Sequence, residues 1–269
     1  MLGPHIREAG TGPAVICIHA GYATSAQWRS LTERLANQFR IITCDMSGSG
    51  KSPTFPRAVE YTLDEEITFL SQVFDVAGDS FHLVGHSFGG AVALKAALRH
   101  RGRVQSLTLI EPTLFALLIS SAPGSDATRE ILTHTESVSQ LADIGRFEAA
   151  AQQFVDYWFQ PGAWAETRED VRADIRNRMN LVRQRWDALL LDPIRIADVA
   201  TIDVPALCIT MQDSRDSTRE LSQLLIRSLP RARTVEIKGV GHMAPLTDPD
   251  QVNPLIHKFL LDIACFPGH

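Results

Sequence analysis

The sequence GHSFG at 85–89 places Ser87 between two glycines in the pattern G-x-S-x-G. An apolar run, 81–84, precedes it and an alanine-rich helical stretch, 88–99, follows it. A strand that turns sharply into a helix strains the serine backbone and exposes its Oγ, so that only small residues fit two positions away on either side. The helix N-terminus would also favour a developing oxyanion. The segment therefore predicts that Ser87 is a nucleophile.

A serine hydroxyl is a weak nucleophile, so Ser87 needs a histidine base from another segment. Of the nine histidines, His242 has the fitting position, because it follows the last strand-like run and precedes the last helical stretch. The other histidines lie on predicted strands or helices or near the chain ends. His82 and His86 are four positions apart, which would make a metal-binding pair only on a helix. We expect His242 to be the base, and we expect no metal site.

The elements that must position these residues alternate between strands and helices in the first half of the chain. Apolar runs typical of buried strands occupy 14–18, 40–44, 81–84 and 104–110. Helical periodicity occupies 24–37, 62–77 and 88–99. This alternation predicts an α/β fold with a mostly parallel, doubly wound central sheet.

The second half of the chain begins with about ninety residues that show helical periodicity and no convincing strand. Strands resume at 205–210 and 234–237, with a helix between them that starts near Ser217 or Thr218, and a final helix covers 249–263. We therefore expect a core built from residues 1–112 and 201–269. Residues 113–200 would form a helical cap inserted between two strands of one sheet.

The predicted cap carries more aromatic and aliphatic side chains than a solvated lid would need. Most should form its own core, and a minority should line an apolar pocket facing Ser87, with Phe115, Leu118, Trp158 and Trp164 as candidates. Such a pocket favours a small hydrophobic substrate over a sugar or a polyanion. The mixed charges of 166–185 indicate a solvated helix face.

Composition excludes several classes of partner. The 269 residues contain 26 Lys and Arg against 31 Asp and Glu, with no basic block, so nucleic acid is not expected to bind. No apolar run reaches the roughly 18 residues of a membrane span, and the first residues lack an export-signal pattern. The four cysteines lie far apart and are expected to be buried, reduced thiols. We expect a cytoplasmic monomer or homodimer that does not bind a membrane.

The segment Gly50-Lys51-Ser52 invites comparison with a phosphate-binding loop. Such a loop requires glycine five positions before its Gly-Lys-Ser, and Asp45 occupies that position here. We therefore expect no nucleotide and no cofactor, so that side chains and backbone groups supply the chemistry.

Taken together, these features resemble the α/β-hydrolase superfamily, in particular its cap-bearing esterase-like and carbon–carbon hydrolase branches. IHAG at 18–21 resembles the family's His-Gly loop, DMSGSGKS at 45–52 its D-x-x-G-x-G-x-S turn, and GHMAPL at 241–246 its histidine segment. The cap would lie between the sixth and seventh family strands, and the opening hairpin is reduced to the strand-like segment 5–10. The resemblance implies acyl transfer by a Ser-His-acid triad. It also implies an oxyanion hole formed by the backbone N–H groups of Gly21 and Phe88.

The triad acid is where this sequence departs from the family pattern. Most members carry the acid after the seventh strand in a pattern like G-x-x-D, but residues 211–214 are MQDS, with Ser214 at the acid position. Asp213 or Asp216 in the same loop could replace it. Glu111 lies at the end of what would be the sixth family strand, and its place resembles that of the acid in some haloalkane dehalogenases. Glu111 is the favoured candidate and Asp213 the main alternative.

The resemblance leads us to expect a cofactor-free serine hydrolase of the carboxylesterase-like type. It would cleave an ester, thioester or activated carbon–carbon bond of a small hydrophobic substrate through an acyl-enzyme. Two alternatives stay open. One is a ligand-sensing or regulatory protein of the same fold with little turnover. The other is a lyase or cofactor-free oxygenase in which His242 is the base and Ser87 only donates a hydrogen bond.

Overall fold

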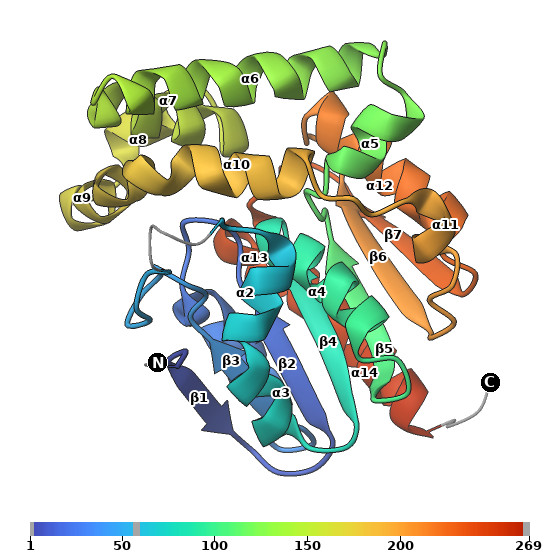
Figure 1. The fold of residues 1–269 in the computed structure, drawn as a ribbon. Helices are drawn as coiled ribbons and strands as arrows, with labels where there is room; N and C mark the ends of the chain where they lie inside the picture. The colour runs from blue at the N-terminus through green and yellow to red at the C-terminus, as the bar shows by residue number, and fades with distance from the viewer. Residues whose placement is uncertain (1–2, 56–59, 266–269) are drawn as a thin grey trace.

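A seven-stranded sheet forms the centre of the computed structural model, which describes residues 3–55 and 60–265 (Figure 1). The strand order is β1-β3-β2-β4-β5-β6-β7, and all neighbouring pairs are parallel except β1 with β3. The strands are β1 (Ile6–Ala9), β2 (Ala14–Ile18), β3 (Arg40–Cys44), β4 (Phe81–His86), β5 (Val104–Ile110), β6 (Ala206–Met211) and β7 (Ala232–Ile237). The predicted α/β fold with a mostly parallel sheet is confirmed.

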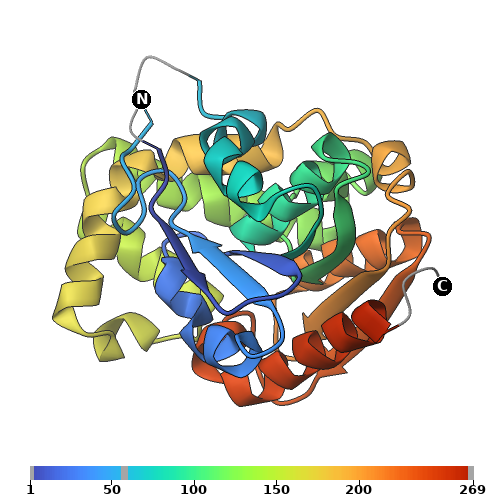
Figure 2. The same cartoon turned by 90° about the horizontal axis from the view of Figure 1, so that it is seen from below.

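Helices cover both faces of this sheet. The 3₁₀ helix η1 (Ser25–Trp28) leads into α1 (Arg29–Leu35), which packs with α14 (Pro249–Cys265) on one face. Figure 2 shows α2 (Leu63–Phe69), α3 (Ser71–Ala77) and α4 (Phe88–Arg99) on the opposite face. The helix predicted over 62–77 is thus two helices, because Leu70 departs from helical geometry with ψ near 7°.

Strand β2 illustrates why the central strands are apolar throughout. Val15 and Cys17 belong to the core under α1 and α14, whereas Ile16 and Ile18 belong to the core under α3 and α4. Successive side chains of a strand point to opposite faces, so a strand covered on both sides needs apolar residues at every position. The same two cores hold the sheet edge from which the functional residues project.

The segment between β5 and β6 is helical and stands above the sheet (Figure 1). It contains α5 (Ala116–Ser121), α6 (Asp126–Asp143), α7 (Phe147–Trp158), α8 (Ala163–Glu166), α9 (Glu169–Arg178), η2 (Met179–Leu181), α10 (Val182–Leu190) and α11 (Ile196–Val199). Helix α6 packs against both α7 and α10. We call α5–α11 the cap helices.

The rest of the chain returns to the sheet after the cap helices. Helix α12 (Asp216–Ser228) connects β6 with β7, and the short α13 (Ala244–Thr247) precedes α14. Cys17, Cys44 and Cys208 are buried and free, and burial raises the pKa of each thiol, to about 12 for Cys208. The side chain of Cys265 lies outside the described residues. Within the described part of the chain, no helix is both long and apolar enough to cross a membrane.

Candidate active site

Ser87 lies at the sharp turn between β4 and α4, with φ of 55° and ψ of −120°. The two flanking glycines permit this turn. A Cβ on Gly85 would lie 2.4 Å from the carbonyl oxygen of Gly89, and a Cβ on Gly89 would lie 2.3 Å from that of His19. Any larger residue would therefore collide with backbone, and the G-x-S-x-G spacing follows from this crowding.

The imidazole of His242 lies between Ser87 and Glu111. His242 follows β7, and its Nε2 is 2.9 Å from Ser87 Oγ, while its Nδ1 is 2.8 Å from Glu111 Oε2. The Glu111 and His242 side chains are 0% and 3% exposed. A carboxylate can only accept a hydrogen bond, so Nδ1 carries the imidazole proton and donates it to Glu111. Nε2 is then free to accept the hydrogen of the serine hydroxyl.

Glu111 also accepts hydrogen bonds from the loop that follows β6. The Met211 N–H donates to Oε1 at 2.8 Å and the Ser214 hydroxyl donates to Oε2 at 2.7 Å. Ser214 occupies the position at which the sequence comparison placed the usual acid. Asp213 and Asp216 are exposed, and Asp216 pairs with Arg219 at the start of α12. The structure therefore brings Glu111, and neither aspartate, to His242.

Gly21 and Phe88 lie beside Ser87 in the lining of one cavity. They face each other, since a Cβ built on Gly21 would lie 3.5 Å from the Cβ of Phe88. Phe88 is the first residue of α4, and the first N–H groups of a helix have no partner inside it. Both residues therefore line the same cavity as Ser87. The family resemblance implies that their backbone N–H groups form an oxyanion hole, and this role stays a prediction.

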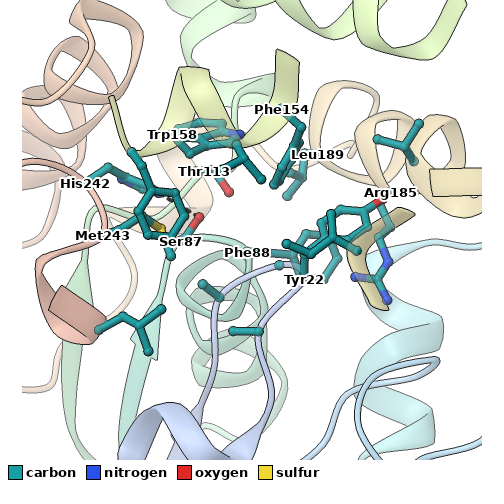
Figure 3. Close-up of a pocket in the computed structure, with 18 of the residues that line it drawn as sticks. Tyr22, Ser87, Phe88, Thr113, Phe154, Trp158, Arg185, Leu189, His242 and Met243 are labelled. Carbon is teal, nitrogen blue, oxygen red and sulfur yellow. Dashed lines mark hydrogen bonds between the residues drawn. The ribbon is translucent and has the colours of Figure 1, made fainter. Parts of the chain in front are cut away.

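A cavity of about 110 Å³ extends from Ser87 and His242 toward the cap helices. Figure 3 shows Ser87, His242 and Met243 at one side of it and Arg185 at the other, with Trp158 and Phe154 between them on α7. The Trp158 ring centroid is 4.5 Å from that of His242. The lining consists of Ala20, Gly21, Tyr22, Ala23, Ser87, Phe88, Thr113, Phe154, Val155, Trp158, Phe159, Val171, Ile175, Val182, Arg185, Trp186, Leu189, His242, Met243 and Leu246.

Of the four predicted pocket residues, only Trp158 lines this cavity. The prediction for Phe115, Leu118 and Trp164 was wrong. Phe115 is fully buried and stacks behind Trp158 with ring centroids 6.5 Å apart, and Leu118 is buried in the core. Trp164 donates its indole N–H to Glu148 within the cap helices. Helical periodicity identifies an apolar face, but it does not identify the neighbour that this face packs against.

The charged stretch 166–185 is only partly a solvated face. Arg178 and Arg185 are 8% and 5% exposed. Arg178 donates to the carbonyl of Tyr22 at 2.8 Å, and Arg185 donates to the carbonyl of Ser47 at 2.8 Å. Both guanidinium groups lie within 5.3 Å of the Tyr22 ring centroid. These arginines connect the cap helices to the core, and the alternating charges of the sequence gave no signal of that role.

Tyr22, Phe154 and Leu246 are further lining residues that were not predicted to line the pocket. Tyr22 has a φ of 61°, which is unusual for a non-glycine residue, and its ring lies 4.7 Å from that of Phe154. Leu246 is the last residue of the GHMAPL segment, so its closeness to His242 in the sequence was the one available signal. Within the described residues, no group of three or more His, Cys, Asp or Glu side chains is placed to hold a metal ion.

The comparisons with known proteins agree with this architecture. The alpha/beta hydrolase family model matches residues 15–255. The pimeloyl-[acyl-carrier protein] methyl ester esterase of Methylococcus capsulatus is 28% identical over 269 residues, covering 96% of this chain and 99% of the relative. The 2-hydroxy-6-oxo-2,4-heptadienoate hydrolase of Pseudomonas putida is 27% identical over 262 residues, covering 95% of this chain and 92% of the relative.

A solved structure gives the same result for the fold. An alpha/beta hydrolase from Sphaerobacter thermophilus superposes with a TM-score of 0.74 at 23% identity, covering 96% of each chain. The family match spans most of the sequence, and both relatives named above are hydrolases. This chain therefore belongs to the α/β hydrolase family.

Proposed function

We propose that this protein is a cofactor-free serine hydrolase that acts on a small hydrophobic substrate through an acyl-enzyme. The observation that carries the proposal is the hydrogen-bonded series Ser87, His242 and Glu111, whose first two members line an apolar cavity. The bond cleaved would be that of an ester, a thioester or an activated carbon–carbon bond next to a carbonyl, because all three reactions transfer an acyl group to serine.

The first half of the reaction forms the acyl-enzyme. Ser87 Oγ attacks the substrate carbonyl carbon while His242 Nε2 takes the hydroxyl proton, and the carbonyl oxygen becomes an oxyanion. The backbone N–H groups of Gly21 and Phe88 would stabilise this oxyanion. Buried Glu111 stabilises the imidazolium that forms. The intermediate then collapses, the bond to the leaving group breaks, and His242 returns the proton to the leaving group.

The second half regenerates the free enzyme. Water replaces the leaving group, His242 takes a proton from the water, and the resulting hydroxide attacks the acyl carbon. The ester bond to Ser87 Oγ breaks and His242 returns the proton to the serine. The acid product leaves, and no oxidant, reductant or metal enters the balance.

The cavity lining supports a hydrophobic substrate. Most of its side chains are aliphatic or aromatic, and three of them, Phe159, Val171 and Leu246, are 37% to 47% exposed. Large exposed apolar residues that gather at one cavity are typical of a binding site. We call these three residues the apolar rim. It would hold the part of the substrate that extends beyond the cavity of about 110 Å³.

The two alternative functions predict different chemistry at Ser87. The ligand-sensing alternative rested on a missing acid, and Glu111 within hydrogen-bond distance of His242 supports the hydrolase instead. A lyase or cofactor-free oxygenase could keep the same geometry, but it would use Ser87 only as a hydrogen-bond donor. Covalent chemistry at Ser87 therefore separates the hydrolase from both alternatives.

The deciding experiment measures hydrolysis of p-nitrophenyl esters of increasing chain length, together with labelling by a fluorophosphonate. The wild type should hydrolyse at least one ester and bind one equivalent of label at Ser87. Ser87→Ala should lose both, whereas Ser228→Ala, which removes a hydroxyl at the end of α12, should keep both. Ester cleavage that persists in Ser87→Ala, or a wild type that neither hydrolyses esters nor takes the label, would refute the serine hydrolase.

A further inference from the structure

Two buried polar side chains next to the active site have no part in the mechanism above. His86 immediately precedes Ser87 and is 0% exposed. Gln27 lies in η1 and is 7% exposed. Neither lines the cavity. Burying such groups costs free energy unless they are hydrogen-bonded, so their partners show what they hold together.

Hydrogen bonds connect these two side chains to two separate loops. The Ala20 N–H donates to Gln27 Oε1 at 3.0 Å, and Gln27 Nε2 is 3.1 Å from His86 Nδ1. His86 Nε2 is in turn 2.9 Å from the carbonyl oxygen of His242. The series begins one residue before Gly21, passes beside Ser87, and ends on the backbone of the base itself.

The two ends of this series determine the position of every proton in it. A backbone N–H can only donate, so the Gln27 oxygen faces Ala20 and the Gln27 amide nitrogen faces His86. That nitrogen donates, so His86 Nδ1 accepts. A backbone carbonyl can only accept, so His86 Nε2 carries the proton and donates it to His242. The Gln27 end and the His242 end of the series therefore require the same neutral tautomer of His86, with its proton on Nε2.

We propose that Gln27 and His86 are positioning residues that hold the oxyanion-hole loop and the His242 loop in register with Ser87. We call the series from the Ala20 N–H to the His242 carbonyl the Gln27–His86 relay. The role rests on the proposed serine hydrolase, but the tautomer that it requires does not. The relay connects backbone to backbone, and neither of its two side chains lines the cavity, so its loss would displace catalytic groups while removing no side chain from the cavity lining.

A second consequence of the relay concerns charge. The His86 and His242 rings have centroids 5.1 Å apart, so a proton added to His86 would oppose the imidazolium that forms on His242. The pKa of His86 lies well below its usual range. Burial is the largest cause, and the charge of the neighbouring His242 is the second. His86 therefore stays neutral while His242 cycles between its two forms. It can hold the base without competing for the serine proton.

The variant Gln27→Met tests the relay, since methionine keeps the length of glutamine and removes both hydrogen bonds. We expect kcat for a p-nitrophenyl ester to fall by about 10²-fold, as for an active-site displacement of about 1 Å, with KM changed less than about twofold. Fluorophosphonate labelling of Ser87 should slow with kcat. The matched control is His82→Gln, which removes another buried histidine of β4, one that is hydrogen-bonded to the Ser106 hydroxyl, and should leave kcat unchanged.

The NMR resonances of the His86 imidazole nitrogens report which nitrogen carries the proton. A general loss of stability would not change this tautomer, whereas loss of the relay would. At pH 7 the wild type should show His86 protonated on Nε2 alone. In Gln27→Glu the second carboxylate oxygen can only accept, so a proton should move to Nδ1 and kcat should fall as in Gln27→Met. Wild-type His86 protonated on Nδ1 would overturn the proposal even if no variant folds, and so would a folded Gln27→Met with kcat within twofold of wild type.

The two proposals fail in different ways. If the wild type shows no Ser87-dependent hydrolysis, the serine hydrolase is wrong, and the His86 tautomer still decides whether the relay exists. If the wild type hydrolyses esters and Gln27→Met does so equally well, only the positioning role is wrong.

Discussion

Glu111 Oε2 lies 2.8 Å from His242 Nδ1, although Glu111 follows β5 and His242 follows β7, with β6 between these strands in the sheet. The contact is made at the carboxyl edge, where β5 and β6 end side by side, with Ile110 paired to Ile209. An acid after either strand can therefore reach the same imidazole. In this chain Ser214, after β6, donates its hydroxyl to the carboxylate that comes from β5.

Replacing Glu111 by glutamine should severely reduce turnover. The amide can no longer accept the bonds from His242, Met211 and Ser214 together, and it places a donor next to the imidazole Nδ1. We expect Glu111→Gln to lose about 3–5 kcal/mol of transition-state stabilisation, or roughly 150-fold to 5,000-fold in kcat/KM. Steady-state kinetics with a p-nitrophenyl ester measures the loss.

Asp213→Asn is the control for that variant, because Asp213 is exposed on the same loop as Ser214. It should change kcat/KM less than twofold. Circular dichroism should show both variants folded. Equal losses from the two variants would mean that the carboxylate seen beside His242 is not the catalytic acid.

The sequence predicts the candidate site where the signal is local. Ser87 and the two glycines beside it follow from steric limits on a strand-to-helix turn, and His242 follows from its place between the last strand and helix. Glu111 stayed one of several candidates, because the choice depends on how β5 and β6 end beside each other. The relative position of these two strand ends is set by strand pairing, and a local sequence pattern does not reveal which residues pair.

The cap helices were predictable as helices but not in their packing. Trp158 and Trp164 have the same side-chain type and lie six positions apart in the sequence, yet one contacts His242 and the other bonds to Glu148. Arg178 and Arg185 resemble surface residues in sequence, and their burial follows from contacts with Tyr22 and Ser47 that lie more than 130 positions away. Tertiary contacts of this kind decide which residues line the cavity.

Buried histidines should make the protein less stable in mild acid. Burial lowers the pKa of His19 and His82 to about 4 and that of His134 to about 3. An unfolded chain protonates these groups near pH 6.5, so between about pH 6.5 and 4 it binds protons that the folded state does not. The free energy of unfolding should therefore fall as pH falls, by about 1.4 kcal/mol per unit for each histidine. Urea denaturation at pH 7 and pH 5 measures the fall.

The variant His82→Gln isolates one of these contributions outside the active site. Glutamine does not titrate. The free energy of unfolding of the variant should therefore fall between pH 7 and pH 5 by about 2 kcal/mol less than that of the wild type. Parallel stability curves for the two proteins would contradict the assignment of a buried neutral His82.

Gly89→Ala should destabilise the fold at the serine turn. Its new Cβ would lie 2.3 Å and 2.4 Å from the carbonyl oxygens of His19 and Ile18, which are backbone atoms and cannot rotate away. We expect a loss of about 3 kcal/mol or more in the free energy of unfolding, measured by urea denaturation. Gly124→Ala is the matched control, because its Cβ would meet no atom within 4 Å and should change stability by less than about 0.5 kcal/mol. If Gly89→Ala were as stable as the wild type, the serine turn would have space for a Cβ at residue 89, contrary to the contacts given above.

Leu246→Ser should change the chain-length preference of ester hydrolysis. Leu246 belongs to the apolar rim and is 47% exposed, so a long acyl chain would cover it while a short one would end inside the cavity. Losing about 40 Å² of apolar contact costs about 1 kcal/mol, so kcat/KM should fall roughly fivefold for long-chain esters and hardly at all for the acetate. Ile144→Ser removes a 71% exposed isoleucine that lies outside the cavity lining, and it should leave both rates unchanged. A Leu246→Ser enzyme that loses activity equally on short and long esters would indicate a general disturbance of the site, because contact with the distal chain affects only the long ones.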